Sequence, residues 1–183
     1  MTKRALFLDR DGVINVDHGY VHRKEHYEFI DGIFELVAEA VARNFLVIIV
    51  TNQAGIGRGY YTEEQFQILM EWVRSEFARR AGRIDDVYFC PYHPEHGIGP
   101  YKCQSPMRKP GPGMIQLACK EHDIDPSASL LVGDNITDML AGIRAGVGIN
   151  LLYSPNVAPV ELASGLEAVE RISSLREAIK YLD

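Results

Sequence analysis

Short apolar runs alternate with amphipathic segments along most of this chain, and few folds accommodate that alternation. Residues 45–50 read Phe-Leu-Val-Ile-Ile-Val, a continuous run of the kind that forms a strand covered on both faces. In the preceding segment, 32–44, apolar residues recur at helical spacing. Strands that alternate with helices in this way build βαβ units. We therefore predict an α/β protein of three layers, in which helices cover both faces of a doubly wound parallel sheet.

The other elements follow from the same patterns. Thr62 and Gln65 have the spacing of a capping box, which predicts a helix that runs from there to about Arg80. From Val157 onward the pattern is weak, until an amphipathic segment closes the chain at 174–182. The remaining expected elements are strands at 5–8, 86–90, 129–133 and 148–152 and helices at 112–122 and 136–145.

Length and composition restrict the class of protein. The chain has 183 residues, of which 46% are hydrophobic and 24% are charged, as in a soluble globular protein. These values exclude a disordered, collagen-like or coiled-coil chain, and we predict one domain over residues 1–183. The net charge of −6 gives no support to a nucleic-acid partner. A small molecule is the expected partner.

The sequence does not predict a membrane or secretory protein. A transmembrane helix needs roughly 18 or more apolar residues, and the chain has no such run. The apolar stretch at 5–8 is too short for a signal peptide. Three cysteines, an odd number, argue against a disulfide framework and for a reducing compartment. We expect a cytoplasmic protein and, because no apolar stripe is evident, a monomer.

Polar residues follow three of the predicted strands at the points where the strands end. Asp9-Arg10-Asp11-Gly12 follows the first strand, Thr51-Asn52-Gln53 the second and Gly133-Asp134-Asn135 the fourth. In open α/β sheets, ligands bind beyond the carboxyl ends of the strands. The side chains that we expect to converge there are Asp9, Asp11, Thr51 and Asp134.

The chemistry of these residues favours phosphoryl transfer. Carboxylates without thiolate or imidazole partners make an oxygen-rich site that suits Mg²⁺ rather than Zn²⁺. Asp9 would attack phosphorus to form an aspartyl phosphate, while Asp11 protonates the leaving oxygen and later activates water. Thr51 and the Asn52 amide would bind phosphoryl oxygens, and Lys109 would add positive charge for the transition state.

Each of these motifs also has a purely structural interpretation. Asp-x-Asp-Gly after a strand is a common turn sequence, although that explanation weakens when three strand ends match together. Arg108-Lys109 alone would be a solvated pair. The glycine-rich stretch 54–59 lacks the spacing of a Rossmann turn or a P-loop. We interpret it as a flexible loop, with Arg58 as a candidate phosphate contact.

Taken in order, the motifs resemble those of the haloacid dehalogenase (HAD) superfamily of phosphotransferases. The matching segments are 7–15, 50–53, 108–110 and, for the fourth motif, Gly133-Asp134 with Asp138. They span nearly the whole chain. The resemblance implies a Rossmann-like HAD fold. The short segments that separate Asp11, Thr51 and Lys109 leave no room for a large cap domain.

A narrower resemblance is to the D-glycero-D-manno-heptose 1,7-bisphosphate 7-phosphatase family, carried by segments 15–21, 29–32, 51–56 and 90–94. It implies a Mg²⁺-dependent phosphomonoesterase that acts on a phosphorylated sugar in heptose biosynthesis for lipopolysaccharide. Histidinol-phosphate phosphatases and other small sugar-phosphate phosphatases share the motifs and are the alternative, although residues 17–20 favour the heptose enzymes. A non-catalytic sugar-phosphate-binding protein is the competing class, against which the intact motifs argue.

The resemblance also implies catalytic and metal-binding roles. Asp9 would be the nucleophile and a Mg²⁺ ligand. Asp11 would be the general acid and base, and its main-chain carbonyl would bind the same ion. Asp134 would be the third protein ligand, supported from behind by Asp138.

The implied substrate contacts lie around this centre. Thr51 and Lys109 would hold the transferring phosphoryl group, and Arg108 would bind the second, non-reacting phosphate. Asn135 stands where the superfamily often has lysine, so one substrate contact would differ. The residues expected to line the sugar are Asp17, His18, Gly19, Tyr20, Asn52, Gln53 and Ala54.

The segment 91–110, with five prolines, departs from the family pattern. Family members bind a structural Zn²⁺ through Cys-x-His and a later Cys-x-Cys, but Tyr92 stands at the histidine position and the second pair is absent. We therefore predict no zinc and a proline-stiffened loop, whose length is typical of functional loops. The less favoured alternative is a rearranged zinc site made of Cys90, His93, His96 and Cys103.

Overall fold

The core of the molecule is a parallel sheet with β1 near its centre. The computed structural model describes residues 2–156, 166 and 168–183. Within that part of the chain, six strands lie in the order β3-β2-β1-β4-β5-β6, and every pairing is parallel. The strands are β1 (Arg4–Leu8), β2 (Phe45–Asn52), β3 (Asp86–Cys90), β4 (Leu130–Gly133), β5 (Ile149–Tyr153) and β6 (Val169–Ile172). Strand order reverses direction at β1, as in the doubly wound fold predicted from the sequence.

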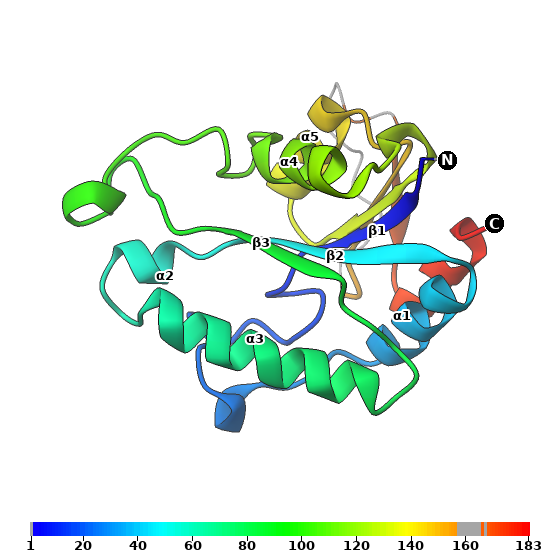
Figure 1. Ribbon diagram of the computed structural model, residues 1–183, viewed down its shortest axis with the longest axis horizontal. Coiled ribbons are helices and arrows are strands. Elements are labelled where there is room, and N and C mark those ends of the chain that lie inside the picture. The colour runs from blue at the N-terminus through cyan, green and yellow to red at the C-terminus, as the bar shows by residue number, and fades with distance from the viewer. Residues whose placement is uncertain (1, 157–165, 167) are drawn as a thin grey trace.

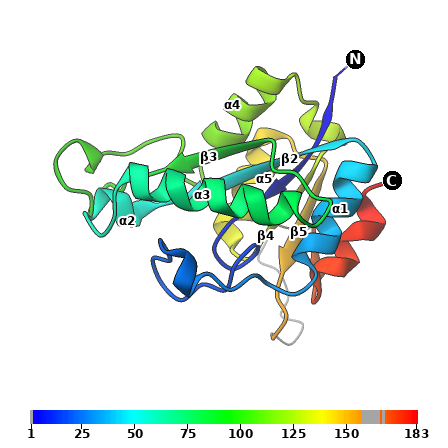
Figure 2. The same cartoon turned by 60° about the horizontal axis from the view of Figure 1, so that its bottom comes forward.

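Helices cover both faces of this sheet (Figures 1 and 2). The α-helices are α1 (Ile33–Ala42), α2 (Ala54–Gly57), α3 (Glu63–Ala78), α4 (Gly113–His122) and α5 (Ile136–Ala145). Four 3-10 helices in the described residues are η1 (Lys24–His26), η2 (Gly99–Tyr101), η3 (Pro126–Ala128) and η4 (Leu175–Tyr181). One face carries α1 and α3, and the other carries α4 and α5. The three predicted layers are confirmed.

The alternation of side chains along β1 divides the core into two halves. Successive strand residues point to opposite faces, so Leu6 and Leu8 pack in the α1 and α3 half. Phe7 packs with Met114 and Met139 in the α4 and α5 half. All five side chains are almost fully buried. A strand covered on both faces needs an unbroken apolar run, which is why the sequence pattern located β1 and β2.

One α-helix and one strand of the described residues, α2 and β6, are absent from the sequence prediction, as are the short 3-10 helices η1, η2 and η3. The short helix α2 lies in the glycine-rich stretch interpreted as a flexible loop, and that interpretation is wrong for 54–57. The strand β6 carries Glu170 and Arg171 between two buried apolar residues. A four-residue edge strand with two charged side chains lacks the continuous apolar run that marks the central strands.

The capping signals were reliable. Thr62 and Gln65 form the predicted reciprocal capping box at the start of α3. The amphipathic segment 174–182 contains η4, which Ser174 and Glu177 cap in the same way. The weak pattern predicted for 157–165 and 167 lies outside the described residues.

The carboxyl edge of the sheet is covered by loops and short helices. Between β1 and α1 the chain contains η1, and between β2 and β3 it contains α2 and α3. No cap domain is inserted among these described segments, in agreement with the prediction. None of the helices in the described part of the chain is long and apolar enough to cross a membrane.

Candidate active site

A cavity of about 440 Å³ opens at the carboxyl ends of β1, β2 and β4. Its lining includes fourteen of the residues predicted for the site: Asp9, Asp11, Asp17, Gly19, Tyr20, Thr51, Asn52, Gln53, Ala54, Arg108, Lys109, Asp134, Asn135 and Asp138. Gly55, Tyr61 and Thr137 line it as well and were not predicted. The strand ends therefore converge as the parallel sheet requires.

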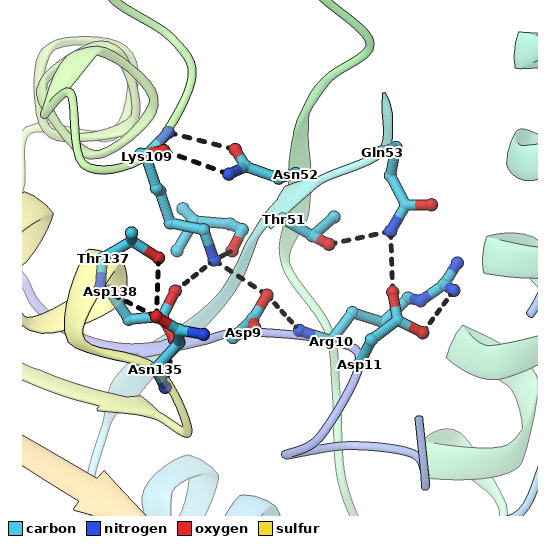
Figure 3. Close-up of polar contacts among 11 residues, drawn as sticks. Asp9, Arg10, Asp11, Thr51, Asn52, Gln53, Lys109, Asn135, Thr137 and Asp138 are labelled. Atoms are coloured by element: carbon cyan, nitrogen blue, oxygen red, sulfur yellow. Dashed lines mark hydrogen bonds and ion pairs between the residues drawn. The ribbon is translucent and has the colours of Figure 1, made fainter. Parts of the chain in front are cut away.

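Lys109 lies between two carboxylates at the centre of this cavity (Figure 3). Its Nζ is 2.8 Å from Asp9 Oδ1 and 2.5 Å from Asp138 Oδ1, and it donates to the Val50 carbonyl at 2.9 Å. Burial alone would lower the pKa of Lys109, but the two carboxylates raise it above its usual range. The amine is thus a fixed positive charge beside Asp9.

The position of Lys109 depends on the end of β2. The Asn52 side chain accepts from the Lys109 main-chain N–H at 3.0 Å and donates to the Lys109 carbonyl at 3.2 Å. These two bonds pair the side chain with one peptide segment, in the way a neighbouring strand would. Asn52 therefore attaches the loop that carries Lys109 to the strand that carries Thr51.

Three carboxylates crowd together near Lys109. Oxygens of Asp9, Asp134 and Asp138 lie within 4.8 Å of one another. Burial raises the pKa of Asp9 to about 8, an effect that Lys109 opposes and Asp138 reinforces. Partial desolvation at the cavity mouth and the charge of Asp138 raise the pKa of Asp134 to about 6. A divalent cation would relieve this repulsion, and an all-oxygen ligand set suits Mg²⁺.

Gly12 allows this cluster to form. Its φ of +88° lies in the region that favours glycine. A Cβ atom at this position would stand 2.0 Å from Asp134 Oδ2. The glycine of the first motif therefore leaves space for the carboxylate of the fourth.

The Asp11 side chain is held apart from the carboxylate cluster. Its Oδ1 accepts from Arg10 Nη2 at 2.6 Å and from Asn15 Nδ2 at 3.0 Å. Its Oδ2 accepts from Gln53 Nε2 at 3.0 Å. Arg10 is fully buried, and the same Nη2 also donates to the Val21 carbonyl. Asp11 is consequently fixed by donors on both oxygens.

Asn135 and Asp138 form a capping box at the start of α5. Asp138 Oδ2 accepts from the Asn135 main-chain N–H at 3.0 Å, and Asn135 Oδ1 accepts from Thr137 N at 3.2 Å. Since its other oxygen contacts Lys109, Asp138 has both oxygens engaged within the protein. The position is consistent with the supporting role expected for it.

His18 lies away from the cavity that receives the other predicted residues. Its Nε2 is 3.2 Å from Glu28 Oε2, and about half of its side chain is exposed. The neighbouring residues do reach the cavity. Asp17 Oδ1 accepts from Gly19 N at 2.9 Å in a turn, after which the partly exposed Tyr20 lines the cavity. The structure therefore does not support the predicted contact between His18 and the sugar.

The residues of the alternative zinc site are not gathered into one centre. Cys90 is buried in the core, whereas Cys103 is exposed. His93 and His96 are neighbours, with ring centroids 4.6 Å apart. In the described part of the chain, the aspartate cluster is the only group of three or more metal-ligating side chains whose ligand atoms lie within 4.8 Å of one another. The rearranged zinc site receives no support.

The proline-rich segment 91–110 lies beside α2 at the edge of the cavity. Ile98 N donates to the Gly57 carbonyl at 2.8 Å, and a Cβ at Gly57 would stand 2.4 Å from the Pro91 carbonyl oxygen. Arg108 lines the cavity, is half-buried, and donates to the Tyr92 carbonyl at 3.3 Å. This segment therefore brings a second cation, besides Lys109, to the cavity.

Curated relatives match this chain over nearly its full length. A phosphatase of Burkholderia mallei named for D-glycero-alpha-D-manno-heptose 1,7-bisphosphate is 54% identical, covering 100% of this chain and 95% of the relative. Two further phosphatases are named for the beta anomer. The one from Vibrio cholerae is 44% identical, covering 100% of this chain and 97% of the relative. The one from Escherichia coli K12 is 45% identical, covering 96% of this chain and 93% of the relative. The chain belongs to the D-glycero-D-manno-heptose 1,7-bisphosphate 7-phosphatase family. By family it is a phosphoric monoester hydrolase.

The wider HAD assignment and the fold agree with this family. The HAD-hydrolase-like family model matches residues 106–176. A solved structure of a Mesorhizobium loti protein assigned as a HAD-like phosphatase has a TM-score of 0.88 and 34% identity, covering 99% of this chain and 86% of its own. The structure of a D,D-heptose 1,7-bisphosphate phosphatase from B. bronchiseptica, complexed with magnesium and phosphate, has a TM-score of 0.81 at 24% identity. It covers 98% of this chain and 97% of its own. The HAD fold predicted from the motifs is confirmed.

Among the lining residues that were not predicted, Thr137 has a signal in the sequence that could have placed it, whereas Tyr61 has none. The Asn135-x-x-Asp138 spacing is a capping signal that would have placed Thr137 at a helix start beside the fourth motif. Tyr61 carries no such signal, because its place depends on how α2 turns the chain. From the sequence, Gly55, which packs against Tyr61, is predicted only as part of a glycine-rich loop.

Proposed function

We propose that this chain is a Mg²⁺-dependent phosphatase that removes the 7-phosphate of D-glycero-D-manno-heptose 1,7-bisphosphate through an aspartyl-phosphate intermediate. The observation that carries the proposal is the pairing of the Asp9 carboxylate with the buried Lys109 ammonium at 2.8 Å, inside a cavity also reached by Arg108. Relatives with up to 54% identity that are named for this reaction support the choice of substrate.

The aspartate cluster is the proposed metal site. Asp9, Asp134 and the main-chain carbonyl of Asp11 would hold Mg²⁺, and Asp138 would orient the cluster through Asn135 and Lys109. Bound Mg²⁺ supplies positive charge that neutralises phosphoryl oxygens and the attacking carboxylate. The raised pKa of Asp9 and Asp134 supports this assignment, because crowded carboxylates favour either protons or a cation.

The first half-reaction forms the aspartyl phosphate. An oxygen of the Asp9 carboxylate attacks phosphorus of the 7-phosphate as the bond between phosphorus and the sugar oxygen breaks. Asp11 donates a proton to that leaving oxygen, which departs as the C7 hydroxyl. Lys109 and the Thr51 hydroxyl stabilise the charge on the transferring group.

The second half-reaction restores the enzyme. Asp11, now ionised, takes a proton from a water molecule that attacks phosphorus. The bond between phosphorus and Asp9 breaks, inorganic phosphate leaves, and the Asp9 carboxylate is regenerated. Arg108 would hold the 1-phosphate throughout, because a guanidinium matches phosphate oxygens in geometry and charge.

The test is phosphate release from both anomers of the heptose bisphosphate and from histidinol phosphate, each with Mg²⁺ and with EDTA. We expect Mg²⁺-dependent release that is fastest with one heptose anomer. Faster release from histidinol phosphate, compared by kcat/KM, would contradict the substrate and retain the mechanism.

A matched pair of variants tests the nucleophile in the same assay. Asp9→Asn should remove activity and keep the fold. Asp123→Asn makes the same chemical change at an exposed site before β4, where the left-handed conformation suits asparagine. It should be fully active. An active Asp9→Asn enzyme would exclude the covalent mechanism.

A further inference from the structure

The Tyr61 hydroxyl is directed into the active site without facing the reacting groups. Tyr61 is 4% exposed and lines the cavity. Its hydroxyl donates to Gln53 Oε1 at 2.5 Å. Burial raises the pKa of Tyr61 to about 12, so the hydroxyl keeps its proton as a donor.

The Gln53 amide connects the Tyr61 hydroxyl to two groups of the proposed mechanism. Its Nε2 donates to Asp11 Oδ2 at 3.0 Å and to Thr51 Oγ1 at 2.8 Å (Figure 3). A primary amide has two N–H donors and one carbonyl oxygen. All three are engaged here, and Gln53 is 2% exposed, so the protein itself supplies its hydrogen-bond partners.

The planarity of the amide makes Tyr61 important for its orientation. Fixing Oε1 fixes the plane and direction of both N–H bonds. A rotated amide would direct its oxygen at the Asp11 carboxylate, where two acceptors would repel each other. Without the Tyr61 hydroxyl, Gln53 Oε1 would be a buried acceptor that lacks its present donor. Rotation or a shift of the amide toward another donor would then be favourable.

The ring of Tyr61 is fixed by packing that does not depend on its hydroxyl. The His22 ring stacks on it at 5.0 Å with an interplanar angle of 5°. Gly55 lies against its edge, where a Cβ would stand 2.3 Å from Tyr61 Cε1. Phenylalanine would therefore keep the ring in place and remove only the hydrogen bond.

We propose that Tyr61 is a positioning residue for the phosphatase reaction: it holds the Gln53 amide, and through that amide the Asp11 carboxylate and the Thr51 hydroxyl. The inference rests on the proposed function for the roles of Asp11 and Thr51. The hydrogen-bond chain itself is independent of substrate and metal.

The kinetic test is Tyr61→Phe, assayed on the heptose bisphosphate with Mg²⁺. Loss of one buried hydrogen bond should lower kcat roughly three- to tenfold and leave KM little changed. In a Gln53→Ala background, the same Tyr61→Phe change should have no further effect, because the group it orients is gone. Equal effects in both backgrounds would overturn the proposal.

Tyr88→Phe is the matched control. Tyr88 is also buried, and its hydroxyl donates to Glu121 Oε2 at 2.5 Å on the α4 side of the sheet. This variant loses a tyrosine hydroxyl bond to the carboxylate of the exposed Glu121, away from the cavity. It should lower stability as Tyr61→Phe does and keep the wild-type kcat.

A second measurement needs neither substrate nor metal. The Gln53 side-chain amide resonance, assigned by its loss in Gln53→Ala, should exchange with solvent faster in metal-free Tyr61→Phe than in metal-free wild type. Unchanged exchange, or an unchanged kcat, would overturn the proposal. Inactivity of the wild-type enzyme on both anomers would instead contradict the proposed function, and the amide exchange would still decide whether Tyr61 holds Gln53.

Discussion

The two sides of the cavity differ in how their carboxylates are paired. On the β4 side, three carboxylates lie within 4.8 Å of one another and face one ammonium, that of Lys109. On the β2 side, a single carboxylate, that of Asp11, accepts three hydrogen bonds. The first side holds excess negative charge, which attracts a cation. A phosphoryl group can bind there only after a cation has neutralised that charge. The second side is already paired and needs no ligand to hold its shape.

The largest effect should come from removing the one cation of the crowded side. Lys109→Met leaves Asp9 and Asp138 buried without their partner, and breaking a buried pair costs about 3–5 kcal/mol. We expect a loss of stability of that order in metal-free protein, measured by denaturant unfolding. Activity should fall about 10²–10³-fold, because a charge that stabilises the transition state is gone.

Lys120→Met is the control for this change. Lys120 is exposed on α4, far from the carboxyl edge of the sheet. It should match the wild type in both measurements. If Lys109→Met unfolds at the wild-type denaturant midpoint, the excess negative charge assigned to this side is wrong.

The same substitution on the two sides should change stability in opposite directions. Asp134→Asn removes one of three repelling carboxylates, so metal-free protein should become more stable while Mg²⁺ affinity falls at least about tenfold. Asp11→Asn replaces a charged acceptor that Arg10 contacts at 2.6 Å, so it should destabilise by about 1–3 kcal/mol. Thermal unfolding with and without Mg²⁺ measures both. Shifts of equal sign in metal-free protein would remove the distinction between the two sides.

The pH dependence of stability should depend on the metal. The pKa of Asp9 is about 8 in the folded chain, against an ordinary value of 3.8. Between these values the folded state retains a proton that the unfolded state has lost, so raising the pH favours unfolding. Metal-free protein should therefore lose stability from about pH 5 to pH 8. Saturating Mg²⁺, which competes with that proton, should flatten or reverse the slope; identical slopes in Mg²⁺ and EDTA would contradict a metal site at Asp9.

The smallest effect concerns Asn135, whose side-chain oxygen caps α5. Asn135→Ala should cost about 1 kcal/mol of stability, as for other lost N-caps. Because that oxygen accepts from Thr137 N, we expect KM to change little. Chemical denaturation and steady-state kinetics together check this. A large rise in KM would establish the substrate contact predicted from the sequence.

The strand ends were predictable because a parallel sheet aligns them. Asp9, Thr51 and Asp134 each follow an apolar run, and the carboxyl ends of parallel strands share one edge. No long-range detail was needed to bring them together. Lys109 was predicted from its motif, and its partner Asn52 from its place at the end of β2, but the two-bond pairing between them appears only in three dimensions.

The other features depend on how loops turn. Asp17-His18-Gly19-Tyr20 was predicted as one sugar-binding stretch, but the turn at Asp17 directs His18 to Glu28 and Tyr20 to the cavity. Tyr61 comes eight positions after Gln53 and reaches it only because α2 reverses the chain between them. Neither outcome follows from hydrophobic periodicity, which specifies strands and helices and leaves loop direction open.

The most direct test of the aspartyl-phosphate mechanism is to trap the phosphate on Asp9. In Asp11→Asn, p-nitrophenyl phosphate should still phosphorylate the enzyme, since its leaving group needs no proton, while attack by water is slowed for lack of a base. We expect a burst of p-nitrophenol of one equivalent and, after borohydride reduction and peptide mapping, homoserine at position 9. A phosphorylated residue other than Asp9, or steady turnover with neither burst nor adduct, would contradict that mechanism.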